Sequence, residues 1–267
     1  MCDSCGCTSG GPKKTAVVAI GGNSLILDKT KKSIPDQVDA AIETCTHIAK
    51  MVEMGWNVVV THGNGPQVGF ILRRSEIASS ELHEVPLDYC GADSQGAIGY
   101  TIQRALVNQF KRDGEKKTVA TVVTQVLVDK DDEAFKNPRK PIGSFMEEDE
   151  AKRREKEDGW NIVEDSGRGF RRVVASPIPV EIVEQPAIEA LLEKDYVVIA
   201  VGGGGIPVIR KDNGDLEGVA AVIDKDHASS LLANNINADV LLISTAVEQV
   251  CLNFGKEDEK KLPKMTM

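Results

Sequence analysis

Short apolar runs followed by glycines recur along this chain, and they constrain its fold more than any other feature. Three such runs are TAVVAI at residues 15–20, WNVVVT at 56–61 and DYVVIAV at 195–201. Runs this short, continuous and β-branched are typical of strands that are buried on both faces. Stretches with helical spacing separate them. The alternation predicts an α/β fold, a three-layer αβα sandwich around a mainly parallel central sheet.

Other stretches complete the alternation. Residues 36–54 carry apolar side chains at helical spacing, with Pro35 at the start and Gly55 at the end. Further helices are predicted at 67–79, 94–111 and 227–236, and further buried strands at 118–128 and 238–244. The repeated pattern predicts one domain over residues 15–267, preceded by a tail at 1–14.

One charge-dense segment breaks this rhythm. Residues 130–158 hold many Lys, Arg, Asp and Glu side chains, but also Phe135, Pro138, Pro141 and Phe145. This segment predicts an excursion from the main sheet that is partly helical at 147–157, although a solvated charged loop is the favoured alternative there. Residues 160–176 then predict two short strands around a glycine turn. We therefore expect a protruding subdomain at about residues 130–172.

Composition excludes several kinds of partner. The 267 residues carry a formal net charge of −9, which argues against nucleic acid and against an anionic membrane as the main partner. No apolar run is long enough to span a bilayer, and residues 1–14 lack the apolar core of a signal peptide. A cytoplasmic location is the resulting expectation.

The six cysteines fall into two groups. Three are clustered in CDSCGC near the start, a spacing that offers only a partial site for a soft metal, so a disordered tail is the preferred interpretation and no metal site is predicted. The other three lie singly in apolar surroundings and are expected to be buried thiols. The clustered residues are Cys2, Cys5 and Cys7, and the single ones are Cys45, Cys90 and Cys251.

Glycine clusters follow three of the predicted strands. Glycine lets backbone N–H groups approach a phosphate closely, and ligands of parallel sheets bind beyond the carboxyl ends of the strands. One cluster alone is most simply a turn, but three at one sheet edge predict a phosphate site. The candidate phosphate- and substrate-binding residues are Gly21, Gly22, Asn23, Gly63, Asn64, Gly65, Gly203 and Gly204.

Familiar nucleotide motifs and nucleophiles are absent from the sequence. It contains neither a P-loop nor a dinucleotide-binding G-x-G-x-x-G after the first strand. His62 lies beside a glycine cluster, where a structural hydrogen bond is the more common role than catalysis. No Ser or Cys nucleophile with a positioned base is visible.

Cations suited to phosphates occur at three places. Lys140, beside Arg139, is held between two prolines, and Lys225 stands between Asp224 and Asp226 at a helix start. Arg168, Arg171 and Arg172 follow in the glycine turn. Glycine loops, lysines and an aspartate that orients them or holds Mg²⁺ are the set that phosphoryl transfer requires.

The order of these motifs resembles that of the carbamate kinases, a family in the amino acid kinase superfamily. The resemblance covers about residues 16–254 and is carried by the following segments: VVAIGGNSL, VVVTHGNGPQVG, PLDYCGADSQGAIGY, NPRKPIGSF, EDSGRGFRRVVASPIP, VVIAVGGGGIPV and EGVAAVIDKDHASSLLA. It implies phosphoryl transfer between ATP and carbamate, giving ADP and carbamoyl phosphate, and often run towards ATP in arginine catabolism. It also implies a homodimer, for which the apolar face of residues 94–111 is the candidate surface unless that face is core.

The resemblance also implies roles for single residues. Gly21, Gly22 and Asn23 would hold the transferred phosphoryl group, and Gly63, Asn64 and Gly65 would help hold carbamate and that phosphate. Lys140 would close over the substrates from the subdomain. The residues implied at the nucleotide are Lys225, Asp226, Ala246 and Val247, with Lys225 stabilising transferred charge and Mg²⁺ accompanying ATP or ADP.

Some positions depart from the family pattern. Ser24 replaces a usual alanine, and Cys251 and Phe254 stand where tyrosines are common. The family's C-terminal segment, with a lysine that touches the nucleotide, is expected to be missing after KLPKMTM. Two alternatives therefore stay open: a kinase for another small carboxylate, and an inactive or fragmentary relative that binds nucleotide or carbamoyl phosphate.

Overall fold

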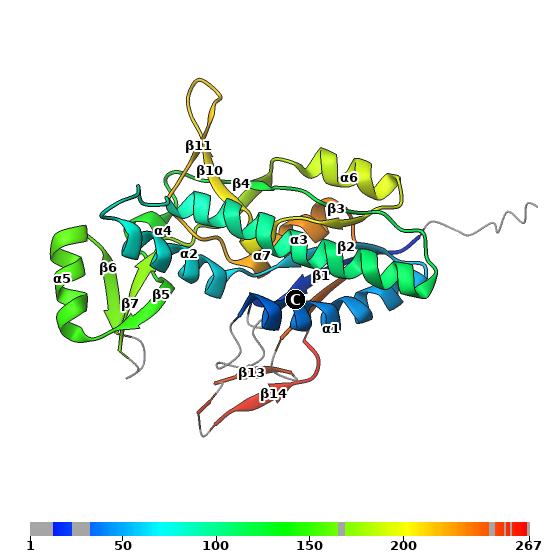
Figure 1. The fold of residues 1–267 in the computed structure, drawn as a ribbon, viewed down its shortest axis with the longest axis horizontal. Coiled ribbons are helices and arrows are strands. Elements are labelled where there is room, and N and C mark those ends of the chain that lie inside the picture. Colours follow the sequence, from blue (N-terminus) through cyan, green and yellow to red (C-terminus); the bar gives the residue numbers. More distant parts are fainter. Residues whose placement is uncertain are drawn as a thin grey trace, which may run out of the picture.

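A five-stranded parallel sheet forms the centre of the molecule (Figure 1). The computed structural model describes residues 13–22, 33–164, 169–245, 249–253, 255–256 and 258–265. All four neighbouring strand pairs in this sheet are parallel. The strand order is β12 (Val240–Ser244), β1 (Thr15–Ile20), β2 (Asn57–His62), β9 (Val197–Ile199) and β3 (Val119–Thr121). The predicted α/β fold with a mainly parallel sheet is confirmed.

Helices cover both faces of this sheet. On one face, helices α1 (Ile34–Glu53) and α3 (Leu87–Asp113) bury Ile48 and Phe110 against Val18 and Val60. On the other face, α6 (Gln185–Glu193) and α7 (Lys225–Asn235) pack against the intervening strand positions. Successive strand side chains point to opposite faces, which is why an unbroken apolar run serves both layers. This arrangement is the expected three-layer sandwich.

A capping residue, a glycine and a proline mark the starts of α1, α2 and α3. Ser33 caps α1 in a capping box with Asp36, and Pro35 occupies its first turn. Helix α2 (Gly65–Ala78) starts directly at the second glycine cluster. Helix α3 begins at Leu87 after Pro86, earlier than the expected residue 94.

The predicted strand at residues 118–128 is wrong as a single element. It forms two strands, β3 in the central sheet and β4 (Gln125–Val128) in a second sheet. At the break, Gln95 of α3 accepts a hydrogen bond from Thr124 N at 2.8 Å and donates one to Thr124 O at 3.0 Å. The side-chain amide thus takes the place of a strand partner at Thr124 N, while Thr124 O also accepts a hydrogen bond from Ile206 N at 2.9 Å, at the point where the chain changes sheets.

The second sheet lies beside the first. Its order is β11 (Leu216–Gly218), β10 (Ile206–Arg210), β4 and β8 (Pro179–Ile182). Strand β10 pairs in parallel with β4 and antiparallel with β11. Strand β10 follows the third glycine cluster, so this sheet fixes where that cluster leaves the central sheet.

A three-stranded antiparallel sheet stands apart from the central layers, at the left of Figure 1. It has the order β5 (Lys140–Met146), β7 (Phe170–Val174) and β6 (Asn161–Glu164). The short helix α4 (Glu133–Lys136) precedes it, and α5 (Glu148–Asp158) joins β5 to β6. We refer to β5, α5, β6 and β7 as the subdomain. The helix expected at residues 147–157 is therefore present, and the loop favoured for that segment is wrong. Residues 165–168 of the predicted glycine turn lie outside the described part.

Ion pairs at helical spacing explain why so charged a segment is helical. Lys152 pairs with Glu148 at 2.6 Å, and Arg153 pairs with both Glu150 and Glu157. Each such exposed pair is weak on its own, but several act together in α5. Ala151 is the one buried residue of α5, so pairing and not burial favours the helix.

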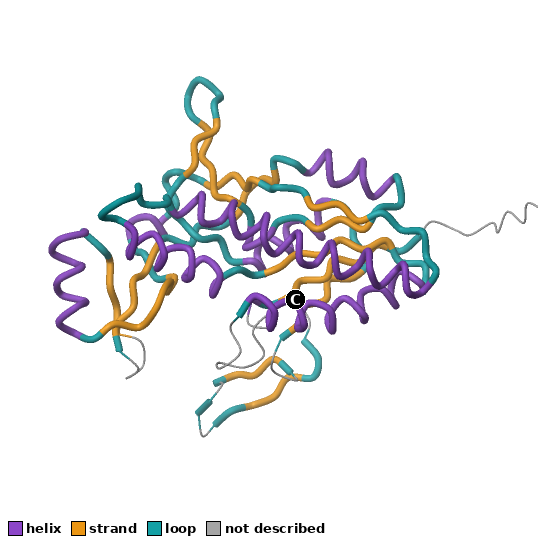
Figure 2. Tube along the Cα trace, in the orientation of Figure 1, coloured by secondary structure: helices purple, strands orange, loops and turns teal. Residues whose placement is uncertain are grey.

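Strand β12 is less buried than its apolar sequence indicated. Leu242 is 42% exposed and Ile243 is 45% exposed, because β12 is the last strand on its side of the described sheet. A separate hairpin of β13 (Val250–Leu252) and β14 (Lys260–Leu262) follows (Figure 2). It carries Cys251, which is half-buried, whereas Cys45 and Cys90 are buried as expected. Cys2, Cys5 and Cys7 lie outside the described residues.

The face of α3 that was the candidate dimer surface is core. Ile98, Ile102, Leu106 and Phe110 are all buried against the central sheet. An apolar stripe on one helix cannot by itself distinguish a core from an interface. Within the described chain, no helix is long and apolar enough to cross a membrane.

Candidate functional site

The three glycine clusters meet at one edge of the central sheet. Gly21 and Gly22 follow β1, Gly63 follows β2, and Gly202 begins the turn after β9. These three strands are neighbours and parallel, so their carboxyl ends lie together. The N–H of Gly63 donates to the carbonyl of Ile20 at 2.8 Å and joins the first cluster to the second. The predicted convergence of the glycine clusters is confirmed.

The first two clusters touch backbone to backbone. A Cβ on Gly63 would lie 2.6 Å from Gly22 N, and a Cβ on Gly22 would lie 3.2 Å from the carbonyl carbon of Gly63. The same Cβ on Gly63 would lie 3.2 Å from Cδ of Lys225, so this lysine runs directly over the second cluster. Glycine is required here for mutual contact of the clusters, a reason that the sequence alone did not reveal.

The third cluster takes a left-handed path that few residues other than glycine adopt. Gly203 and Gly204 have φ values of 67° and 89°. A Cβ on Gly203 would lie 2.1 Å from Nδ2 of Asn64, so the turn after β9 closes against the second cluster. Gly65 opens α2, and its added Cβ would meet nothing within 4 Å. The space beside Gly65 is therefore open.

Asn64 is held inside the protein. Its Nδ2 donates to Ser94 Oγ of α3 at 2.8 Å, and the residue is only 6% exposed. At least one N–H group of this candidate binding residue is therefore used to join the second cluster to α3. Gln95, which follows Ser94 on α3, donates a hydrogen bond to the carbonyl of Gly202 at 2.9 Å. Sequence reasoning missed both partners on α3, because nothing local marks a contact so distant in sequence.

His62 is a structural residue, as the sequence interpretation favoured. It is buried, and its Nδ1 lies 3.2 Å from the carbonyl oxygen of Gly63. Burial lowers the pKa of His62 to about 4, so the ring is neutral at pH 7. A neutral imidazole in this position supports the second and third clusters without adding charge to the site.

The start of α7 brings charge to this edge. Asp224 is its N-cap and accepts a hydrogen bond from the N–H of Asp226 at 2.9 Å. Lys225 Nζ pairs with Oδ1 of Asp226. Ser229, one turn further on, lies 2.7 Å from Thr61 of β2 through their hydroxyl oxygens, which fixes α7 against the central sheet. The lysine that crosses the second cluster thus starts from a firmly capped helix.

Lys140 reaches this helix start from the subdomain. Its Nζ donates to the second carboxylate oxygen of Asp224 at 2.8 Å. Burial alone would raise the pKa of Asp224, but the hydrogen bonds from Lys140 and from Asp226 N hold it below its ordinary value. Asp224 therefore stays ionised at pH 7 and connects both candidate lysines, one by an ion pair and one through the helix cap.

Most predicted site residues are brought together by these contacts. One connected group is formed by the glycine loops after β1 and β2, the turn after β9, Lys140, Lys225 and Asp226. Asn23, Ala246 and Val247 lie outside the described residues, as does Arg168. Asp224 was missed as a site residue: its helix-cap position was visible in the sequence, but its pairing with a residue 84 positions away was not.

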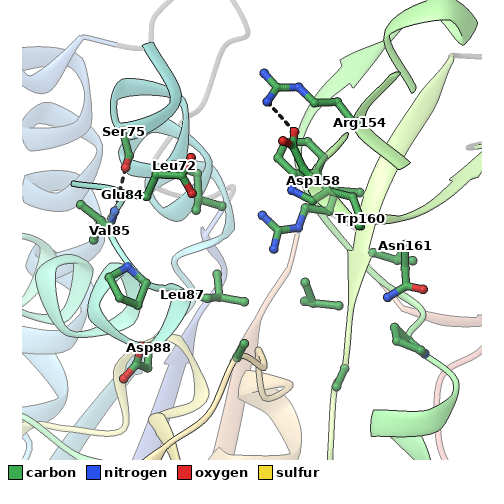
Figure 3. A pocket seen from close by; sticks show the side chains of 18 of the residues that line it. Leu72, Ser75, Glu84, Val85, Leu87, Asp88, Arg154, Asp158, Trp160 and Asn161 are labelled. Atoms are coloured by element: carbon green, nitrogen blue, oxygen red, sulfur yellow. Dashed lines mark hydrogen bonds and ion pairs between the residues drawn. The ribbon is translucent and has the colours of Figure 1, made fainter. Parts of the chain in front are cut away.

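Two hollows lie beside the subdomain and not at the glycine clusters. One has a volume of about 800 Å³ and the other about 500 Å³, and both are lined by Leu72, Arg154, Trp160 and Arg172. Figure 3 shows the larger one opening between α2 and α3 on one side and the subdomain on the other. Neither Lys140, Lys225 nor any of the three clusters lines them.

The chain is similar to known proteins over nearly its whole length. Residues 14–267 match the amino acid kinase family. The carbamate kinase-like protein YahI of Escherichia coli is 52% identical over 95% of this chain and 81% of its own length. The carbamate kinase of Thermococcus kodakarensis is 47% identical over the same shares of the two chains.

Solved structures agree with the sequence matches. The carbamate kinase of Giardia lamblia bound to AMP-PNP superimposes with a TM-score of 0.85 at 45% identity, covering 94% of this chain and 79% of that one. Fold, motif order and coverage thus point the same way. The chain belongs to the amino acid kinase family, and within it to the carbamate kinases.

Proposed function

We propose that this protein is a carbamate kinase that catalyses reversible phosphoryl transfer between ATP and carbamate. The observation that carries the proposal is the meeting of Lys140 and Lys225 at Asp224, beside three glycine clusters at one sheet edge. Two cations from different parts of the chain can neutralise a phosphoryl group from two sides. The carbamate kinases among the relatives and the AMP-PNP complex of the Giardia lamblia enzyme support it.

The reaction requires the protein mainly to position the substrates and to neutralise charge. A carbamate oxygen forms the new bond to the γ-phosphorus, while the bond from that phosphorus to the β,γ-bridging oxygen breaks and ADP leaves. The attacking oxygen is already anionic, so no strong base is required. Positioning and stabilisation of the transferred charge account for the acceleration.

Each part of the site has a proposed role. Backbone N–H groups at Gly21, Gly22 and Asn23 would hold the transferred phosphoryl group, and those of residues 63–65 would hold carbamate. Lys140 would act from the acceptor side. Lys225 and Asp226 would serve the nucleotide phosphates, with Ala246 and Val247 beside the adenine. The turn at Gly203 and Gly204 supports the second cluster through Asn64.

Mg²⁺ would enter with the nucleotide. The described part of the chain contains no group of three or more His, Cys, Asp or Glu side chains that could hold a metal ion. Mg²⁺ usually takes substrate phosphates and waters as ligands with only one or two carboxylates, so the nucleotide phosphates would supply most of its ligation at the protein site. When bound, the ion would neutralise charge on the phosphate oxygens.

Asp224 would position both lysines. Its ion pair brings Lys140 down from the subdomain, and its cap to Asp226 N fixes the helix turn that carries Lys225. An arriving phosphate offers the lysines a second anion. We therefore propose that Lys140 moves between the carboxylate and the phosphate during turnover while Asp224 keeps it close.

A coupled assay tests the proposed activity. Carbamoyl phosphate and MgADP are supplied, and ATP formation is followed through hexokinase and glucose-6-phosphate dehydrogenase. ATP formation that requires carbamoyl phosphate is the expected result, and acetyl phosphate serves as the control donor. A protein that binds MgADP but forms no ATP would support the non-catalytic alternative.

From the resemblance to the family, we also propose that the enzyme is cytoplasmic and runs towards ATP in arginine catabolism.

The first prediction concerns Gly22. We expect Gly22→Val to abolish phosphoryl transfer, because the added carbons would push against Gly63 and Asn64 and fill the proposed phosphate nest. Circular dichroism should show a folded protein. Gly96→Ala, an exposed α3 position whose Cβ meets nothing, is the matched control and should keep full activity. Normal turnover in Gly22→Val would show that this glycine cluster is only a turn and does not bind phosphate.

The second prediction concerns Lys140. Replacing it by alanine should lower kcat by about two orders of magnitude or more, the scale for loss of one charge stabiliser. The KM for ADP should change less, since this lysine would act from the acceptor side. Steady-state kinetics check both numbers. An unchanged kcat with a raised ADP KM would instead place Lys140 at the nucleotide.

The third prediction concerns Asp224. Asp224→Asn keeps an oxygen that can cap α7 but removes the charge that holds Lys140, so we expect kcat to fall roughly tenfold or more with little change in thermal stability. In a Lys140→Ala background the same substitution should have almost no further effect on kcat. A double-mutant cycle measures this. Independent, multiplying effects would show that Asp224 does not act through Lys140.

The fourth prediction concerns assembly, which the family resemblance suggests. We propose a homodimer, and sedimentation velocity at micromolar concentration should give the mass of two chains. The surface cannot be the apolar face of α3, which is core. A monomer throughout the concentration range would reject the dimer and leave the proposed activity untouched.

A further inference from the structure

The larger hollow beside the subdomain is built differently from the candidate kinase site. On one wall are Leu72, Glu84, Leu87 and Asp88, and across from them are Arg154, Asp158 and Trp160 (Figure 3). Its volume of about 800 Å³ falls in the range of pockets that hold small molecules. Polar groups line it among apolar side chains.

Two arginines stack on the same ring in this hollow, but only one has counterions. The guanidinium carbons of Arg154 and Arg172 lie 4.8 Å and 4.6 Å from the centre of the Trp160 ring. Arg154 pairs with Glu150 at 2.9 Å and with Asp158 at 2.8 Å. The guanidinium of Arg172 has no ion pair or hydrogen bond to any residue that the structure describes.

Arg172 is half-buried. Burial lowers the pKa of its guanidinium, and Glu76, Glu84 and Asp158 raise it from beyond ion-pair distance. A guanidinium carries five N–H donors, and no protein side chain among the described residues accepts from those of Arg172. The donors of Arg172 are thus available to an acceptor that enters the hollow.

The carboxylates across the hollow also lack side-chain partners. Exposed Glu84 and half-buried Asp88 have no hydrogen bond or ion pair to another side chain in the described chain. Around the whole hollow four carboxylates face two guanidiniums, namely Glu76, Glu84, Asp88 and Asp158 against Arg154 and Arg172. A plain anion would meet Arg172 but also this excess of negative charge. A plain cation would leave Arg172 without an acceptor.

We propose that this hollow binds a small zwitterion, an amino acid with a basic side chain, whose carboxylate meets Arg172 and whose cationic groups meet Glu84 and Asp88. The planar guanidinium suits a carboxylate, and the apolar wall of Leu72 and Leu87 suits a methylene chain. A net positive ligand also balances the excess of carboxylates. The site is separate from the kinase chemistry, so binding does not depend on the proposed activity.

Such a ligand would touch the body and the subdomain at once. Glu84 and Asp88 belong to the segment around the start of α3, whereas Arg172 lies on β7. Strand β7 pairs with β5, and its Val174 is the register partner of Lys140. Occupancy of the hollow would therefore restrict the subdomain that carries Lys140.

Isothermal titration calorimetry with L-lysine on the full chain tests the proposal. Three matched compounds lack charged groups of L-lysine: L-norleucine lacks the side-chain ammonium, cadaverine lacks the carboxylate, and hexanoate lacks both amines. L-lysine should bind saturably, and each of the three should bind at least tenfold more weakly, the scale of one lost charge-assisted contact. Absence of saturable L-lysine binding up to about 10 mM would overturn the proposal.

Variants locate the binding. Arg172→Gln should weaken L-lysine binding about tenfold or more, and Asp88→Asn should weaken it from the opposite wall. Arg153→Gln, which removes an exposed arginine of α5 that does not line the hollow, should leave the affinity unchanged. Asp88→Asn decides the matter if Arg172→Gln fails to fold. L-lysine binding that neither Arg172→Gln nor Asp88→Asn weakens would place the ligand elsewhere and reject this site.

Discussion

The ion pair between Lys140 and Asp224 joins the two parts of the molecule on which the candidate site depends. One oxygen of Asp224 holds the subdomain lysine at 2.8 Å, and the other caps the helix that begins with Lys225. Both side chains of the pair are about one-third exposed, so the contact contributes about 1 kcal/mol or less to stability. Because the folded pKa of Asp224 is depressed, that contribution is present above the ordinary carboxyl pKa and is lost as the pH falls through the folded value. A contact this weak can be exchanged during turnover, whereas a strong buried pair could not.

The glycine clusters supply the rigidity that this exchangeable contact lacks. Gly22 and Gly63 touch backbone to backbone, and Lys225 runs over the second of them. Gln95 fixes Gly202 from α3, and Thr61 and Ser229 tie β2 to α7. These contacts lie above a core in which strand positions alternate between two apolar layers. Part of the site is thus preorganised by packing, and Lys140 joins it from the subdomain through its ion pair with Asp224.

Local pattern predicted the layers and the sheet edge, because buried parallel strands and the glycines after them are marked in the sequence itself. What it missed are contacts made by side chains far apart in the chain. Gln95 divides the run at 118–128 into β3 and β4 by replacing a strand partner at Thr124. The apolar stripe of α3 has the same periodicity whether it covers a sheet or another chain, so its burial could not be decided in advance. Strand β12 has a core-like sequence, yet its exposure depends on which elements lie beyond it in space. The pairing of Asp224 with Lys140 likewise depends on how the subdomain folds back.

The two regions of positive charge differ in one respect that separates their chemistry. At the glycine clusters each lysine already has a carboxylate, so a phosphate must compete for it, and the competition can be reversed when product leaves. Arg172 in the hollow has no such partner among the described residues, and its stacking on Trp160 does not satisfy its N–H donors. A group with that deficit gains more from a ligand acceptor than a paired lysine does, because no existing ion pair has to break. The paired lysines therefore suit a contact that forms and breaks. The arginine without a partner among the described residues, opposite carboxylates that also lack side-chain partners, suits a ligand that stays bound.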